Sequence, residues 1–280
     1  MIGGVIYKAY HKRLQKEVVL KKIKRKSRDA RINRNEVDIL KNLNHMYLPQ
    51  VVDFFEENGE IYTAMSFIPG RSLKELMEER RQFSQRQLIR WAMQLCSALN
   101  YLHTQTPPII HGDIKPANIM VTPRGDVCLI DFNVSFAVNG NTVLGYTEGY
   151  ASPEQYIIAL DSREGRELPQ YRVIDEKSDI YSTGATLFHL ITGKKAGRNR
   201  TKAEEYLLKN YVSEAFAAVI LKAMDPKSEK RYKNAREMFQ ALQNVYKKDA
   251  RYRKLVIGQR VAMLGLVAGM GLSIIAIGYG

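Results

Sequence analysis

Three short runs near the start of the chain are rich in β-branched and aromatic residues. They lie at 18–23, 51–55 and 61–67, and such residues favour the half-buried surface of a sheet. The second and third runs flank Asn58-Gly59, a pair typical of the tight turn between two antiparallel strands. The pattern predicts three strands of one small sheet.

Helical periodicity appears once among these strands, at 34–43, where Val37, Leu40 and Leu43 share one face. From Ser72 onward it dominates the chain. Ser72 stands three residues before Glu75, as in a helix capping box. Further helices are predicted at 85–103, 178–192, 201–224 and 234–247. The fold class is therefore α+β, with a small β-rich lobe followed by a large helical lobe.

The C-terminal segment 261–279 has a different composition. It contains no charged residue, and its one clearly polar side chain is Ser273. At about 1.5 Å per residue in a helix, it nearly spans a hydrocarbon core of about 30 Å. A basic flank precedes it, as expected on the cytoplasmic side of a span: Lys247, Lys248, Arg251, Arg253, Lys254 and Arg260. A buried core helix is the alternative, but the segment shows no polar face in its support.

Composition adds little to this picture. The chain has 280 residues, 45% of them apolar, and a formal charge of +14. Such a charge suits nucleic acid, an anionic membrane or nucleotide phosphates. The two cysteines, Cys96 and Cys128, form no C-x-x-C pair, so the sequence supports neither a disulfide framework nor a zinc site. We interpret both as core residues.

The richest motif is IHGDIKPANIM at 110–120, followed by VCLIDFN at 127–133. This order and spacing resemble the catalytic loop and metal site of eukaryotic-type Ser/Thr protein kinases of the bacterial kind. The resemblance implies a two-lobed protein-kinase fold that uses ATP and Mg²⁺. It makes Asp113 the carboxylate beside the attacking hydroxyl and Lys115 the cation on the transferring phosphoryl group. It makes Asn118 and Asp131 the metal ligands.

The resemblance also implies an ATP site. Lys21 matches the lysine that contacts the α- and β-phosphates, and Glu36 matches its helical glutamate partner. Gly4 matches the third glycine of the glycine-rich loop. The remaining predicted contacts are the apolar walls and the gatekeeper and hinge segment: Ile6, Val19 and Met120, then Met65, Ser66, Phe67 and Ile68.

Downstream, GYASPE at 149–154 resembles the end of the activation segment, with Ser152 where the family has Ala. In the family, the matching Glu154 pairs with an arginine, here Arg231, and Asp179 braces the catalytic loop. These three positions are predicted to be structural. Thr147 matches the substrate-side threonine that contacts Asp113 and Lys115.

Three departures qualify the resemblance. The glycine-rich loop is incomplete, and its first strand is missing, so we expect an N-terminally truncated chain with weaker ATP binding. Gly112 replaces the arginine that ordinarily receives an activation-loop phosphate, which predicts less dependence on that switch. Asn133 replaces the glycine of D-F-G, and asparagine tolerates a left-handed backbone. We do not interpret this change as inactivating.

These observations predict a kinase domain at 1–246, with an N-lobe at 1–68 and a C-lobe at 69–246, a basic juxtamembrane segment at 247–260 and a transmembrane helix at 261–279. The predicted enzyme phosphorylates protein Ser and Thr hydroxyls at the cytoplasmic membrane face. A catalytically silent scaffold is the alternative. No recognition motif supports nucleic-acid binding. Gly265 and Gly269 allow a homodimer through the span, although such glycines are often merely tolerated.

Overall fold

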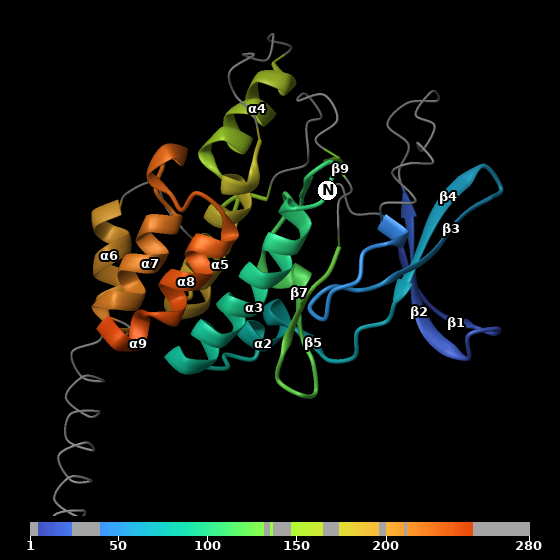
Figure 1. The fold of residues 1–280 in the computed structure, drawn as a ribbon, viewed down its shortest axis with the longest axis horizontal. Coiled ribbons are helices and arrows are strands. Elements are labelled where there is room, and N and C mark those ends of the chain that lie inside the picture. Colours follow the sequence, from blue (N-terminus) through green and yellow to red (C-terminus); the bar gives the residue numbers. More distant parts are fainter. Residues whose placement is uncertain are drawn as a thin grey trace, which may run out of the picture.

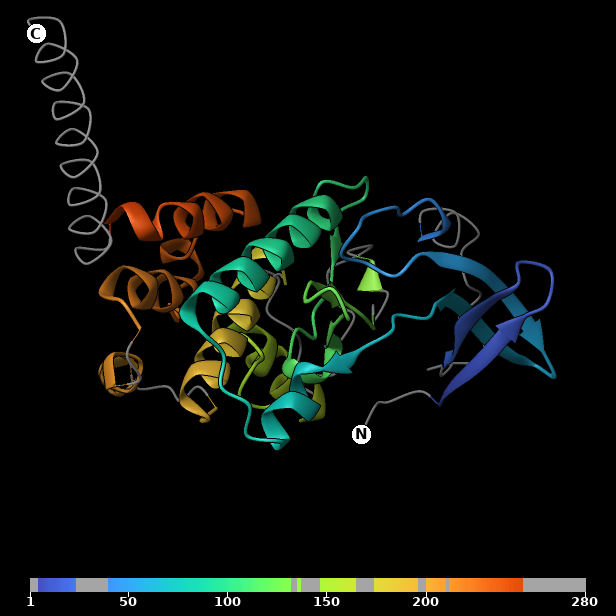
Figure 2. The same cartoon turned by 90° about the horizontal axis from the view of Figure 1, so that it is seen from below.

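The computed structural model describes residues 5–23, 40–131, 135–136, 147–164, 174–195, 200–209 and 212–248. Figures 1 and 2 show an antiparallel sheet at one end of the molecule and a group of helices at the other. The chain passes from the sheet to the helices through residues 66–72. The expected α+β fold with a β-rich N-lobe and a helical C-lobe is confirmed.

The N-lobe sheet has four strands in the order β1-β2-β4-β3, all antiparallel. Their bounds are Ile6–His11 for β1, Lys16–Ile23 for β2, Val51–Glu57 for β3 and Glu60–Ser66 for β4. The three strands expected from the sequence are β2, β3 and β4. Asn58 and Gly59, with φ of 52° and 75°, form the predicted tight turn between β3 and β4. β1 was not among the predicted strands.

Short strands carry the catalytic segments in the C-lobe. One sheet pairs β5 (Arg71–Ser72), β7 (Ile119–Val121) and β8 (Val127–Leu129), and another pairs β6 (Ile109–Ile110) with β9 (Ser135–Phe136). Gly70 lies so close to this sheet that an added Cβ would stand 2.0 Å from the Val121 carbonyl oxygen. Its φ of 128° is also open only to glycine. The interlobe segment therefore needs glycine at this position.

Helices make up most of the C-lobe: α2 (Leu73–Glu78), α3 (Gln85–His103), α4 (Pro153–Arg163), α5 (Glu176–Thr192), α6 (Arg200–Lys209), α7 (Glu214–Ala223), α8 (Ala235–Gln243) and α9 (Val245–Lys248), with short 3-10 turns at Pro116–Asn118 and Ser228–Lys230. Ser72 and Glu75 form the predicted capping box of α2. The predicted helix at 85–103 is α3 with unchanged bounds.

The sequence analysis was wrong about two helical stretches. The single helix expected at 201–224 is two helices, α6 and α7, and Ser213 caps the second with its side chain. The helix expected at 234–247 is likewise split, with α8 ending before α9 begins. Local caps override a continuous apolar pattern because they satisfy the free N–H groups of a helix start. The helix predicted at 34–43 lies mostly outside the described residues, although Leu40 and Leu43 are buried.

The core centres on α3 and α5, which run through the C-lobe (Figure 2). Cys96 and Cys128 are both buried and free, and burial raises the pKa of each thiol to about 12. The interpretation of the cysteines as core residues is confirmed.

No helix among the described residues, the last of which is Lys248, is long and apolar enough to cross a membrane. The predicted span at 261–279 lies outside them, as does most of the juxtamembrane segment.

Candidate active site

The catalytic loop joins β6 to β7, and its polar side chains converge on Asp113. Lys115 donates from Nζ to Asp113 Oδ2 at 2.6 Å, and Thr147 donates from Oγ1 to Asp113 Oδ1 at 2.7 Å. Lys115 also donates to the Thr147 hydroxyl at 2.9 Å. The structure therefore brings together a carboxylate, a cation and a hydroxyl, as the sequence predicted.

Asn118 stabilises the catalytic loop through hydrogen bonds to Asp113. Its amide nitrogen donates to the Asp113 carbonyl at 2.8 Å and to Asp113 Oδ2 at 3.1 Å. Its backbone carbonyl accepts from the Ile130 N–H at 2.9 Å. This last bond ties the loop to the strand end that carries Asp131, so the two predicted metal ligands lie on neighbouring backbone.

Asp179 on α5 braces the loop from below. It is fully buried, and its carboxylate accepts from the N–H groups of His111 at 2.9 Å and Gly112 at 2.8 Å, and from His103 Nε2 at 2.8 Å. Burial alone would raise the pKa of Asp179, but these donors outweigh it and hold that pKa below the ordinary value. The carboxylate therefore stays charged and fixes the loop backbone.

Lys21 reaches across from β2 in the N-lobe and forms an ion pair with Asp131. Asp131 has φ of 65°, a left-handed conformation that aspartate tolerates better than most residues. Glu36, Gly4 and Asn133 lie outside the described residues, so their predicted roles stay predictions.

The residues present fit a magnesium ion. Asn118 and Asp131 offer an amide oxygen and a carboxylate, and Mg²⁺ typically takes one or two such protein ligands together with substrate phosphates. Within the described ranges no group of three or more His, Cys, Asp or Glu forms a metal cluster of its own. The pair therefore suits a metal that arrives with a nucleotide.

The predicted adenine-side residues lie on β1, β2, β4 and β7 and in the segment that follows β4. Val19 on β2 pairs in register with Met65 on β4, and Met120 on β7 pairs with Ser72. Met65 is buried, whereas Ile6 on the edge strand β1 is 57% exposed. Ser66 is held by Gln50, and the Phe67 N–H donates to the Glu17 carbonyl at 3.4 Å. Ile68 follows in the segment between the lobes.

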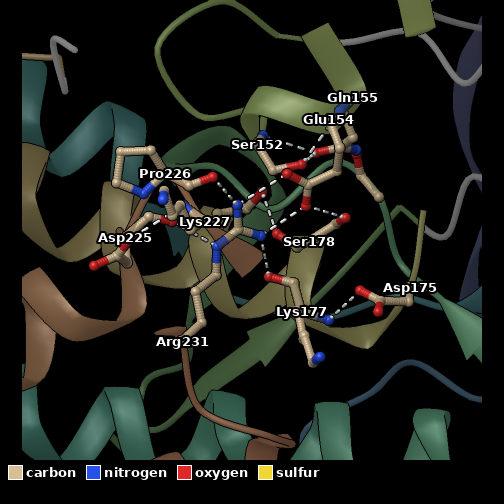
Figure 3. Close-up of polar contacts among 12 residues, drawn as sticks. Ser152, Glu154, Gln155, Asp175, Lys177, Ser178, Asp225, Pro226, Lys227 and Arg231 are labelled. Carbon is tan, nitrogen blue, oxygen red and sulfur yellow. Dashed lines mark hydrogen bonds and ion pairs between the residues drawn. The ribbon is translucent and has the colours of Figure 1, made fainter. Parts of the chain in front are cut away.

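Glu154 and Arg231 form the predicted ion pair, drawn in Figure 3. It is bidentate, with contacts of 2.6 and 2.9 Å. The guanidinium also donates to the carbonyls of Asp225, Lys177 and Pro226. Burial would raise the pKa of Glu154, but the hydrogen bonds and charge of Arg231 lower it overall. The pair locks α4 against α5 and the turn before α8.

Sequence reasoning missed Gln155 and the whole of α4. Gln155 is buried, and its amide donates to the Gly112 carbonyl at 2.8 Å. A signal was present: Ser152, Pro153 and Gln155 follow the capping-box pattern with proline at the first helical position. The family resemblance draws attention to Ser152 only as a substitution within the activation-segment motif.

These contacts join the catalytic loop, the metal-ligand strand and the activation-segment end in one arrangement. A model of the family described as "Protein kinase domain" matches residues 2–256. The chain belongs to this family. Several of its relatives are named serine/threonine-protein kinases.

Two bacterial relatives illustrate the similarity. A probable serine/threonine-protein kinase of Clostridium acetobutylicum is 28% identical over 267 residues, covering 87% of this chain and 38% of that protein. One from Streptomyces coelicolor is 31% identical over 208 residues, covering 68% of this chain and 28% of that protein. The chain thus spans well under half the length of these kinases.

Among solved structures, the PknI kinase domain of Mycobacterium tuberculosis superposes with a TM-score of 0.65 at 19% identity. The match covers 87% of this chain and 91% of that one. At this identity the likeness supports the protein kinase fold alone.

Proposed function

We propose that this chain transfers the γ-phosphoryl group of MgATP to Ser and Thr hydroxyls of proteins at the cytoplasmic face of a membrane. The observation that carries the phosphotransfer is the Asp113 cluster. A hydroxyl, that of Thr147, already donates to Oδ1 of this carboxylate at 2.7 Å. A substrate hydroxyl needs a contact of the same kind to lose its proton.

Asp113 can serve a second hydroxyl without losing its partners. A carboxylate offers about four lone-pair sites, and within the described part of the chain Lys115, Asn118 and Thr147 donate to its side-chain oxygens. Lys115 adds a positive charge next to the point where the phosphoryl group would arrive. When bound with ATP, Mg²⁺ would neutralise charge on the transferring group. Asn118 and Asp131 are the residues that would hold it.

The activity is tested by incubating the full chain in detergent with MgATP and a Ser/Thr-containing protein. We expect phosphoserine and phosphothreonine, no phosphotyrosine, and loss of transfer when EDTA removes the metal. Lys21→Met should lower activity strongly, because it removes the cation expected on the nucleotide phosphates. ATP binding without any transfer would instead favour the silent scaffold.

The membrane location rests on the sequence of 261–279 and its basic flank. Positive residues beside a span remain on the cytoplasmic side, where ATP is available. We expect the full chain to resist an alkaline carbonate wash and a truncation after Lys248 to be soluble. Release of the full chain by the wash would exclude the anchor.

A homodimer through the span is the proposed use of Gly265 and Gly269, whose spacing lets two helices approach closely. Gly265→Leu should reduce crosslinking between full-length chains in membranes. Leu264→Ala is the matched control and should leave it unchanged. Equal crosslinking in the Gly265 variant would exclude this dimer.

We further propose that a strand upstream of β1 completes the N-lobe sheet in the whole protein. β1 is the edge strand of the described sheet, and Ile6 and Tyr7 on it are 57% and 49% exposed. An open edge with apolar side chains is suited to a further strand. Adding a strand ahead of β1 should tighten ATP binding, and an unchanged dissociation constant would refute this proposal.

A further inference from the structure

Gly112, the residue before Asp113, is held on both sides of its backbone. Its N–H donates to Asp179 Oδ1 at 2.8 Å, and its carbonyl accepts from Gln155 Nε2 at 2.8 Å. Its φ is 74°, a conformation that glycine adopts freely. One bond comes from α5 and the other from α4, so two helices clamp the peptide units that lead into the catalytic carboxylate.

Ser152 fixes the orientation of the Gln155 amide. Gln155 Oε1 accepts from the Ser152 N–H at 3.0 Å and from the Ser152 hydroxyl at 3.2 Å. Because that oxygen faces a backbone donor and Nε2 faces a carbonyl, only one orientation of the amide satisfies both ends. Ser152 and Gln155 are 0% and 3% exposed, so water does not compete readily for these bonds.

The segment that starts at Thr147 therefore grips the catalytic loop at two points. Thr147 binds the Asp113 side chain, and Gln155 binds the backbone immediately before it. Neither contact needs a phosphate or an arginine side chain at position 112. We propose that Gln155, oriented by Ser152, is a positioning residue that holds Asp113 in place through the Gly112 carbonyl. Its kinetic consequence rests on the phosphotransfer proposed above.

The most informative variant is Gln155→Glu. Glutamate is equally suited to a capping box, so the Ser152 contacts are kept while the donor to Gly112 is lost. An ionised carboxylate would place an oxygen against the carbonyl, whereas a protonated one could donate its proton and restore the bond. We expect kcat to fall by about 10- to 100-fold as this carboxyl ionises, with the KM for ATP unchanged.

The ionisation of a glutamate at position 155 can be separated from that of neighbouring groups in the pH dependence of kcat. Among the described residues, the titratable and charged groups linked to the Gly112 and Gln155 contact by hydrogen bonds or by chain neighbours are His103 from α3, Asp179 from α5, Glu154 on α4 with its partner Arg231, and His111 and Asp113 on the loop. All are present in wild type, so their ionisations appear in both pH profiles. The proposal requires one additional ionisation in the pH profile of Gln155→Glu, with the higher kcat on the acid side, where the carboxyl group is protonated and can donate to the Gly112 carbonyl. Superimposable profiles would overturn it.

Two further variants complete the set. Gln155→Met has a similar length but no donor, and should lose a comparable factor in kcat at every pH. Gln87→Glu makes the same change in the Ser84–Gln87 capping box of α3, at an exposed position, and should behave as wild type. A wild-type kcat in Gln155→Met would overturn the proposal. This test remains valid if Gln155→Glu fails to fold.

Amide hydrogen exchange supplies a measurement that does not depend on catalysis. In Gln155→Met the peptide 109–113 should exchange about fivefold faster or more, while the peptides of α5 and α7 exchange as in wild type. Equal protection of 109–113 would overturn the role of Gln155. Loss of protection throughout α5 and α7 would do so too, because the residue would then only support the fold. If the wild-type chain transfers no phosphoryl group, the proposed function is refuted, but the hydrogen-exchange comparison can still be interpreted because it needs no activity.

Discussion

The segment 147–164 takes part in two charged clusters, which differ in how far their side chains are exposed. At one end, Thr147 contacts Asp113 and Lys115, whose side chains are 11% and 23% exposed. At the other, Glu154 binds Arg231, and their side chains are 15% and 0% exposed. The two carboxylates are thus similarly exposed, and the clusters differ in the cation: Lys115 is partly exposed, whereas Arg231 is sealed and donates to the protein itself. The first pair therefore keeps a cation that an incoming phosphoryl group could reach, and the second pair is architectural.

Asp113→Asn should give the largest loss of kcat. It distinguishes the catalytic cluster from the architectural one, because activity should fall while stability is kept. Asparagine keeps the shape but cannot take up the hydroxyl proton, so kcat should fall by about 10³- to 10⁴-fold. The melting temperature should stay near that of wild type, because the change is isosteric. The measurements are a phosphotransfer assay and a thermal melt of the same preparation. Activity equal to wild type would remove Asp113 from the catalytic role.

Arg231→Met tests the sealed cluster. It leaves the Glu154 carboxylate buried without its bidentate partner, which should cost about 3–5 kcal/mol in the free energy of unfolding. Urea denaturation measures this loss. Arg90→Met is the control, since Arg90 pairs with Asp126 at the surface and its side chain is 55% exposed. A loss no larger than that of the control would contradict the architectural role.

Glu154→Gln gives a smaller loss with a defined pH dependence. The folded protein holds the pKa of Glu154 below its ordinary 4.5, so the ionised group stabilises the fold above pH 4.5. That contribution disappears as the pH falls through the folded pKa. The free energy of unfolding of the variant should be about 1–3 kcal/mol below that of wild type at neutral pH. This difference between the two proteins should become smaller as the pH falls below the ordinary pKa of a glutamate. A difference in unfolding free energy that does not change with pH would exclude a stabilising role for the ionised Glu154.

Gly112→Ala should carry a modest backbone penalty, and it brings the comparison back to the catalytic loop. A Cβ at φ of 74° costs about 1–2 kcal/mol. Gly125→Ala carries the same backbone penalty at φ of 78°, and an added Cβ there meets nothing within 4 Å. Gly112→Ala should lose at least as much stability in urea as Gly125→Ala, because Gly112 is buried, but only Gly112→Ala should lower kcat. Equal kcat in the two would mean that the Gly112 backbone does not position Asp113.

The sequence alone determined the local and motif-level features. Strand composition, the Asn58-Gly59 turn and the Ser72 cap act within a few residues, so β3, β4 and the start of α2 could be predicted from them. The spacing of Asp113, Lys115 and Asn118 carried the family resemblance that identified the catalytic loop, because these residues lie on one short turn. Ion-pair partners as distant as Glu154 and Arg231 came from the family resemblance, since no local pattern joins them.

Tertiary structure decided where chain segments stop and which distant groups meet. The continuous apolar pattern at 201–224 concealed a break, because the Ser213 cap lies within it. The contact of Gln155 with Gly112 links residues 43 positions apart. Such a bond depends on α4 packing under the catalytic loop, and neither partner carries a sign of the other in its own neighbourhood. Packing brings these backbone and side-chain groups together, and burial then makes each hydrogen bond obligatory.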